Sequence, residues 1–200
     1  MATTEYGNMS HTFQEIDALP EALAAEAAAR SKTDAALAEL IDSGAKNKVH
    51  ITRSTLTETK RGITATFDPV AGTVELDGDH DGTGGAIFEL YSGNAADQPK
   101  LPPGTYHLSG CPAGGSTTTY RISLASSINA TDTGDGVDFT IDTAAALAPR
   151  ILISEPSGAS VSFNHTVCKI MVCLKSAWDI SNKFVPYCPD LQELWGMIQS

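Results

Sequence analysis

Three aspartates lie close together in the sequence and could bind a cation. Asp77, Asp79 and Asp81 alternate with other residues and precede a glycine, which copies the opening of an EF-hand calcium loop. That loop also needs a bidentate carboxylate at its twelfth position, which is Phe88 here. A hairpin turn at Asp77-Gly78 is therefore the first interpretation, and a structural Ca²⁺ held by the three aspartates is the alternative. We expect no other metal and no cofactor.

Aromatic side chains are the second kind of candidate, because sugar rings stack on aromatic faces. Trp178 lies in a turn-like segment, and we take it, with Tyr91 and Tyr120, as the candidate glycan-binding residues. Tyr106 and Tyr187 belong to the same set of aromatics. For each ring the alternative is packing in a β-sheet core, which gives the same sequence pattern.

Catalytic motifs are missing from the sequence. It contains no GxSxG elbow, no HExxH pair and no glycine-rich phosphate loop. The five histidines have no ligand-like spacing, and nothing singles out one pair among the 24 Asp and Glu residues for glycoside cleavage. We therefore expect that the protein is not an enzyme.

Composition limits the partners and the compartment. The net charge of −11 disfavours nucleic acid and anionic membranes as partners, because both are negatively charged. No apolar run approaches the roughly 20 residues of a membrane helix, and the N-terminus lacks a secretory signal. The expectation is synthesis in the cytoplasm with four free thiols, although a Cys111–Cys188 bridge stays open.

An alanine-rich stretch predicts a helical stalk over residues 20–44, after a polar N-terminal segment of residues 1–19. Pro20 suits the first helical position, Gly44 suits a C-cap, and alanine is the best helix former. Steps of four and three residues define a coiled-coil seam, the expected contact between copies of an oligomeric stalk. The seam consists of Leu23, Ala27, Arg30, Asp34, Leu37 and Ile41. The alternative is a single amphipathic helix that packs on the rest of the chain.

From residue 45 to 188 the pattern is that of an all-β head. Short runs of Val, Ile, Thr, Phe and Tyr alternate with Gly, Asp, Asn and Pro, without helical runs between them. This predicts a mainly β fold, an antiparallel sandwich of the jelly-roll type. The predicted strands are 49–57, 63–68, 73–77, 86–91, 104–109, 118–125, 137–142, 150–154, 160–164 and 167–174. A short helix is predicted for residues 189–200, docked on the same chain or on a neighbouring subunit.

One run in the head resembles a known signature. Leu101-Pro-Pro-Gly-Thr-Tyr-His-Leu-Ser-Gly-Cys-Pro-Ala-Gly-Gly-Ser116 is similar to the LPAGTYTLSGCPSGG element of phage and prophage structural proteins from gut Firmicutes, which carry a carbohydrate-binding-module-like β-sandwich. Weaker similarities keep the same order along the chain, at residues 62–67, 72–78, 136–141, 167–172 and 184–187. The chain departs from the pattern at Lys46–Val49 and after Tyr187.

The resemblance implies a virion protein, a fibre or appendage of the tail or capsid, and a helical stalk that leads into a β head is then expected to assemble as a homotrimer. It implies attachment to other virion proteins through residues 1–19, and a head at the virion surface that binds host or mucosal glycans. Release by lysis would then need no signal peptide. The alternatives are a carbohydrate-binding module of a bacterial surface protein, and a decoration or baseplate protein without a ligand.

Overall fold

The computed structural model describes residues 21–32, 47–125, 127–154 and 161–187. The chain divides into two compact units, residues 1–42 and residues 43–200, which are described separately. Several predictions lie outside the described residues. These are the N-terminal segment 1–19, the helix predicted at 189–200, and the seam residues Asp34, Leu37 and Ile41.

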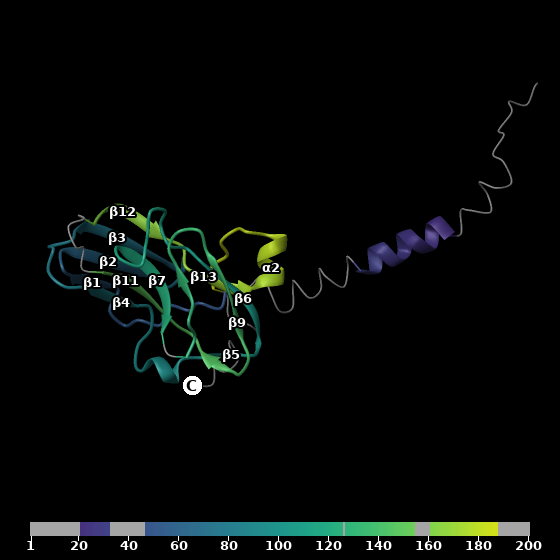
Figure 1. The fold of residues 1–200 in the computed structure, drawn as a ribbon, viewed down its shortest axis with the longest axis horizontal. Coiled ribbons are helices and arrows are strands. Elements are labelled where there is room, and N and C mark those ends of the chain that lie inside the picture. The colour runs from purple at the N-terminus through teal and green to yellow at the C-terminus, as the bar shows by residue number, and fades with distance from the viewer. Residues whose placement is uncertain (1–20, 33–46, 126, 155–160, 188–200) are drawn as a thin grey trace, which may run out of the picture. The chain divides into compact units, whose positions relative to one another are not determined.

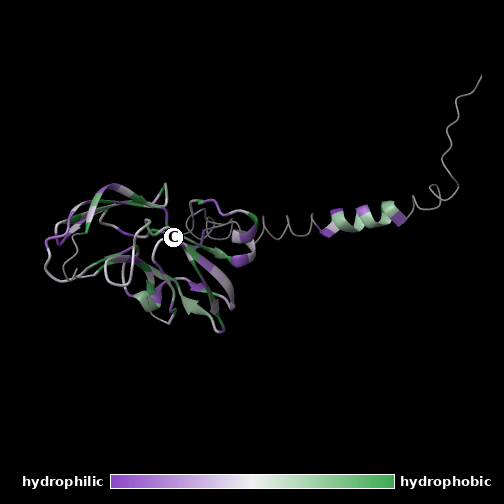
Figure 2. Ribbon diagram, turned by 45° about the horizontal axis from the view of Figure 1, so that its top comes forward, coloured by the Kyte–Doolittle hydropathy of each residue, from purple (hydrophilic) through white to green (hydrophobic). Residues whose placement is uncertain are grey.

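The first unit contains a helix of 12 residues, 21–32, which confirms the helical prediction over that stretch. All of its residues are exposed, and Figure 2 shows hydrophobic positions interrupted by hydrophilic ones along it. Leu23, Ala27 and Arg30 share one face by their spacing, and Leu23 is 70% exposed. Arg30 Nη2 donates to Glu26 Oε1 at 2.9 Å, one turn away. Neither described helix is long and apolar enough to cross a membrane.

The second unit is mainly β, as predicted, and its sheets are antiparallel (Figure 1). The strands of the first sheet, in their order across the sheet β1-β2-β3-β12, are Thr57–Lys60, Ile63–Asp68, Thr73–Asp79 and Ser162–Cys168. Those of the second sheet, in the order β4-β11-β7-β8, are Ala86–Glu89, Ala148–Ile153, Tyr120–Ala125 and Thr131–Asp132. Those of the third sheet, in the order β13-β6-β9, are Met171–Leu174, Gly104–Ser109 and Val137–Ile141. A two-stranded sheet pairs β10, Ala145–Ala146, with β5, Lys100–Leu101.

The pairings between distant strands are nested. β3 pairs with β12, β4 with β11, β6 with β9, and β7 with β8, so each pair encloses the next along the chain. β6 also pairs with β13, which follows β12 after Lys169 and Ile170. Strands from the two ends of the head therefore lie side by side.

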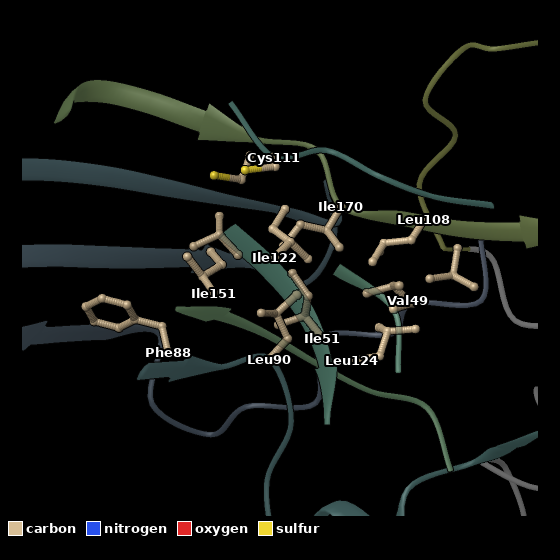
Figure 3. Close-up of a cluster of buried hydrophobic side chains, with 14 of the residues drawn as sticks. Val49, Ile51, Phe88, Leu90, Leu108, Cys111, Ile122, Leu124, Ile151 and Ile170 are labelled. Atoms are coloured by element: carbon tan, nitrogen blue, oxygen red, sulfur yellow. The ribbon is translucent and has the colours of Figure 1, made fainter. Parts of the chain in front are cut away.

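One hydrophobic core joins the sheets. Alternate residues are buried along the strands, as in β2, where Ile63, Ala65 and Phe67 point inward. Figure 3 shows side chains of β4, β6, β7 and β11 meeting with those of the irregular segments around Val49 and Leu90. The alternation that predicted strands in the sequence thus corresponds to the observed core.

The predicted strand 49–57 is wrong over most of its length, because strand β1 begins only at Thr57. Val49 and Ile51 are buried in alternation, but the backbone of this segment forms hydrogen bonds to two different segments of the chain. Lys48 N donates to Val172 O at 2.8 Å, and Thr52 N donates to Leu90 O at 3.1 Å. The burial pattern is that of a strand, whereas the hydrogen bonds do not form a ladder.

The predicted hairpin turn at Asp77-Gly78 is also wrong. Strand β3 continues through both residues to Asp79, and Gly78 (φ 108°) pairs with Phe163 of β12. The chain then crosses to β4 in another sheet, so β3 and β4 are not a hairpin.

The predicted break between strands 160–164 and 167–174 is displaced. β12 runs through it with a register shift between Phe163 and Thr166, where His165 has a φ of 46°. The interruption falls at residues 169–170 instead. Helix α2, Lys175–Ile180, follows β13 where the sequence suggested only a turn. The short elements η2 (Ala95–Asp97), β5, β8 and β10 were not predicted either.

Candidate functional site

Tyr91 and Tyr120, two of the predicted sugar-binding residues, are engaged in the fold. Tyr91 is only 5% exposed, and its hydroxyl donates to Glu89 Oε1 at 3.2 Å; burial, with the Glu89 charge, raises the pKa of Tyr91. The Tyr120 hydroxyl donates to Ala113 O at 2.6 Å, and its ring meets the Phe163 ring edge-on, with centroids 5.1 Å apart. These contacts are those of packed rings.

Trp178 lies on α2 and is partly buried. One face of its ring stacks on His107, with centroids 4.0 Å apart and planes 14° apart. His107 Nδ1 is 2.6 Å from Asp138 Oδ1, which fixes the imidazole beneath the tryptophan. Helix α2 therefore covers the outer face of β6, and this explains why Tyr106, His107 and Leu108 are all buried in succession.

The three aspartates do not form a metal site. Asp77 Oδ1 accepts from His165 N at 3.2 Å, Asp79 ends β3, and Asp81 Oδ1 accepts from Thr83 N and Thr83 Oγ1 at 2.8 and 2.7 Å. These hydrogen bonds from Thr83 hold the pKa of Asp81 below its usual value. In the part of the chain that the structure describes, no three His, Cys, Asp or Glu side chains come together as a ligand set.

A cleft of about 500 Å³ is a candidate binding site. We call it the β5–β6 cleft, because most of its wall comes from these strands and the loops at their ends. It is within the size range of ligand pockets, which is about 300–1,000 Å³. The lining residues are Lys48, His50, residues 99–103, Tyr106, Leu147, Leu174 and Tyr187.

An aromatic pair from the two ends of the head contributes to this cleft. The rings of His50 and Tyr187 stack with centroids 4.4 Å apart and planes 10° apart. His50 is held by its neighbours in sequence, because the side chains of Val49 and Ile51 are anchored in the core. Tyr187 belongs to the segment after α2, which passes close to Gly72.

The floor of the cleft is buried and mainly apolar. Tyr106 is 1% exposed, donates from its hydroxyl to Pro102 O at 2.9 Å, and stacks on Phe139 at 5.7 Å between centroids. Leu101 and Leu147 are buried beside it. An apolar floor with polar groups around it is the usual arrangement of a site for a small ligand.

The three thiols that the structure describes offer no reactive group. Cys111, Cys168 and Cys173 are free and buried. Burial raises the pKa of Cys111 and of Cys168 to about 12, and that of Cys173 to about 11. Thiolates, the reactive form, are therefore scarce at neutral pH. Cys188 lies outside the described residues.

Sequence reasoning found only part of this site. Tyr106 and Tyr187 were in the aromatic set, but His50 and the two lysines carried no signal, since their neighbours in space are distant in sequence. The available signal was the Leu101–Ser116 run, which supplies Leu101, Pro102, Pro103 and Tyr106 to the cleft wall.

A scan against protein-family models, a search of curated proteins and a search of solved structures found no match to this chain.

Proposed function

We propose that this chain is a structural protein of a bacteriophage particle, a tail or capsid appendage whose β head binds host or mucosal glycans through the β5–β6 cleft. It assembles as a homotrimer, residues 1–19 attach it to other virion proteins, and the head faces outward at the virion surface. It has no catalytic role. The resemblance of residues 101–116 to phage structural proteins supports the virion part of the proposal.

The strand pairings support a jelly-roll head. A jelly roll has eight strands in two sheets, built from two Greek keys. The nested pairs give two such sheets if β12 and β13 count as one interrupted strand: β3-β12/β13-β6-β9 and β4-β11-β7-β8. Strands β1 and β2 extend the first sheet at its edge. Jelly rolls are frequent in viral capsid proteins and lectins.

The exposed face of the N-terminal helix supports self-association. Leu23 is 70% exposed, and Ala27 and Arg30 continue the same face. A helix of 12 residues is short for stability in water by itself, since isolated helices below about 12–15 residues are marginal. Winding against copies of itself along the seam would stabilise it.

The composition of the β5–β6 cleft carries the carbohydrate part of the proposal. The run that resembles phage proteins forms much of its wall, and a stacked His50–Tyr187 pair adds two rings. Sugars bind to such sites through contact of their C–H faces with aromatic rings and through hydrogen bonds to polar groups nearby. Trp178, by comparison, stacks on His107 and is not among the residues that line the cleft.

A glycan array with neutral and acidic sugars tests the carbohydrate function. We expect the purified protein to bind a subset of glycans, Tyr187→Ala to abolish binding, and Trp178→Ala to leave it unchanged. Circular dichroism must show that both variants keep the fold. If the array is silent for the wild type, the head is a scaffold. If Trp178→Ala alone removes binding, the site lies on α2.

Peptide mass spectrometry of purified virions tests the virion part. The chain should be found in intact particles at a constant ratio to the major capsid protein, and gentle detachment should release trimers. Its absence from particles, with abundance in the lysate, would contradict the structural role.

A further inference from the structure

The charges around the β5–β6 cleft are opposite in sign to those of the whole protein. The net charge of the protein is −11, yet the charged residues that line the cleft are Lys48 and Lys100. The imidazole of His50 also lines it. Among the described residues, no Asp or Glu lines it. At physiological salt, ions screen the repulsion between an anion and the distant negative charges of the protein. An anion in the cleft therefore interacts mainly with the nearby lysines.

The two lysines are also available for a ligand. Two other lysines of the head form ion pairs: Lys60 Nζ lies 2.8 Å from Glu58 Oε1, and Lys175 pairs with Asp179. Within the described part of the chain, neither Lys48 nor Lys100 has a carboxylate partner. Lys48 is partly buried, and Lys100 is exposed.

We propose that the β5–β6 cleft selects saccharides that carry an anionic group, a carboxylate or a sulfate, over their neutral counterparts. This inference rests on the proposed carbohydrate function and adds the class of sugar. The sugar ring lies against the His50–Tyr187 pair, and the anionic group accepts hydrogen bonds from the lysine ammonium groups. Ammonium groups bind anions as compact point charges, without the geometric demands of an arginine.

The size of the effect follows from the position of the lysines. Charge-assisted hydrogen bonds are stronger than neutral ones, but both side chains remain in contact with water. We therefore expect the loss of one lysine to weaken binding of an acidic saccharide about tenfold. Binding of neutral sugars should change by less than about twofold, since they lack the partner charge.

Dextran, carboxymethyl-dextran and dextran sulfate are suitable probes because they share a glucose backbone and differ in charge. Biolayer interferometry should show binding of the full chain to at least one of the two charged polymers and much weaker binding to dextran. The two charged arms separate a carboxylate from a sulfate preference. Lys48→Ala and Lys100→Ala should each weaken binding, whereas Lys169→Ala, an exposed lysine outside the cleft, should not.

Each result bears on the inference in a definite way. Equal binding of charged and neutral sugars, on the array or on the dextrans, overturns the anionic preference but leaves the carbohydrate function intact. If Lys48→Ala and Lys169→Ala reduce the binding of charged sugars equally, the inference is also overturned, because binding then follows the overall charge of the protein and not the cleft lysines. Silence with every sugar contradicts both the inference and the proposed function.

Discussion

Asn47 connects the start of the described head to its last strand. The side chain is fully buried; Nδ2 donates to Ile170 O at 2.9 Å, and Oδ1 accepts from Val49 N and Val172 N, both at 3.0 Å. The amide thus satisfies three backbone groups that no ladder satisfies here. This is why an irregular segment can be buried without a strand around it.

Replacement of Asn47 by alanine should destabilise the head strongly. Unsatisfied buried groups cost about 1–3 kcal/mol each, so we expect Asn47→Ala to lower the free energy of unfolding by about 3 kcal/mol. Urea denaturation measures the change, and Asn164→Ala, at an exposed position of β12, is the matched control. Equal midpoints for the two variants would mean that the three hydrogen bonds contribute nothing to stability.

His165 and Glu75 form a pair that depends on pH. His165 Nδ1 lies 2.9 Å from Glu75 Oε1, and this hydrogen bond, with the charge of Asp77, raises the pKa of His165. A raised pKa in the folded state stabilises the fold below the unfolded value of about 6.5. That contribution is lost as the pH rises through the folded pKa, and it is small because the side chain is 71% exposed.

Glu75→Gln should lower the pKa of His165, as followed by its imidazole resonances in an NMR titration. The variant should also be less stable than the wild type at about pH 6, with a difference that shrinks above about pH 8. Asp142→Asn removes an exposed carboxylate elsewhere and should leave the His165 titration unchanged. A pKa that Glu75→Gln does not move would show that the pair does not persist in solution.

At the scale of elements, the sequence predicts most of the strands. It misses the places where pairing with a neighbouring strand decides whether a strand continues or breaks. The strands predicted at residues 63–68 and 104–109 are observed with the same bounds, as β2 and β6. The displaced break in β12 shows the limit. The predicted strands leave a gap at residues 165 and 166, but β3 continues alongside and the chain accommodates the extra residues as an irregularity. Strand β8 has two residues, too few for any periodicity.

Gly110 shows how the Leu101–Ser116 run supports this arrangement. It follows β6 with a φ of 114°, and a Cβ atom there would lie 2.4 Å from Lys169 O. The close approach brings the end of β6 against the interruption between β12 and β13. A glycine is therefore required at position 110 because a side chain would collide with the backbone of Lys169, and the sequence alone does not reveal this contact.

Gly110→Ala should be far more damaging than alanine at a glycine that has room. Backbone strain at a left-handed position costs about 1–3 kcal/mol, and overpacking adds about 1–3 kcal/mol. Gly82 is the matched control, because its φ is 78° and no atom lies within 4 Å of the hypothetical Cβ. We expect Gly82→Ala to cost about 1 kcal/mol in urea denaturation, from strain alone. Similar losses for both variants would show that the contact with Lys169 relaxes freely.

At the scale of the whole molecule, the chain divides into compact units of residues 1–42 and 43–200. The candidate site in the second unit could not be predicted from the sequence. His50, Lys100 and Tyr187 meet only because the nested pairings return the end of the head to its beginning. Three of the predicted seam residues, Asp34, Leu37 and Ile41, lie outside the described residues, so assembly is a question for solution measurements.

The assembly prediction depends on one face of the N-terminal helix. Light scattering should give three times the chain mass of 21.0 kDa for the wild type. Ala27→Asp places a carboxylate on the seam, where three copies would meet and repel one another, so the mass should fall towards that of a single chain. Ala25→Asp is the control, since it adds the same residue two positions away, off the seam, with a similar cost in helix propensity. If both variants lose the trimer, the helix contributes to assembly by its stability and not by the seam. If the wild type is itself a monomer, the proposal of a trimeric appendage is wrong, and the glycan array alone then tests binding by the head.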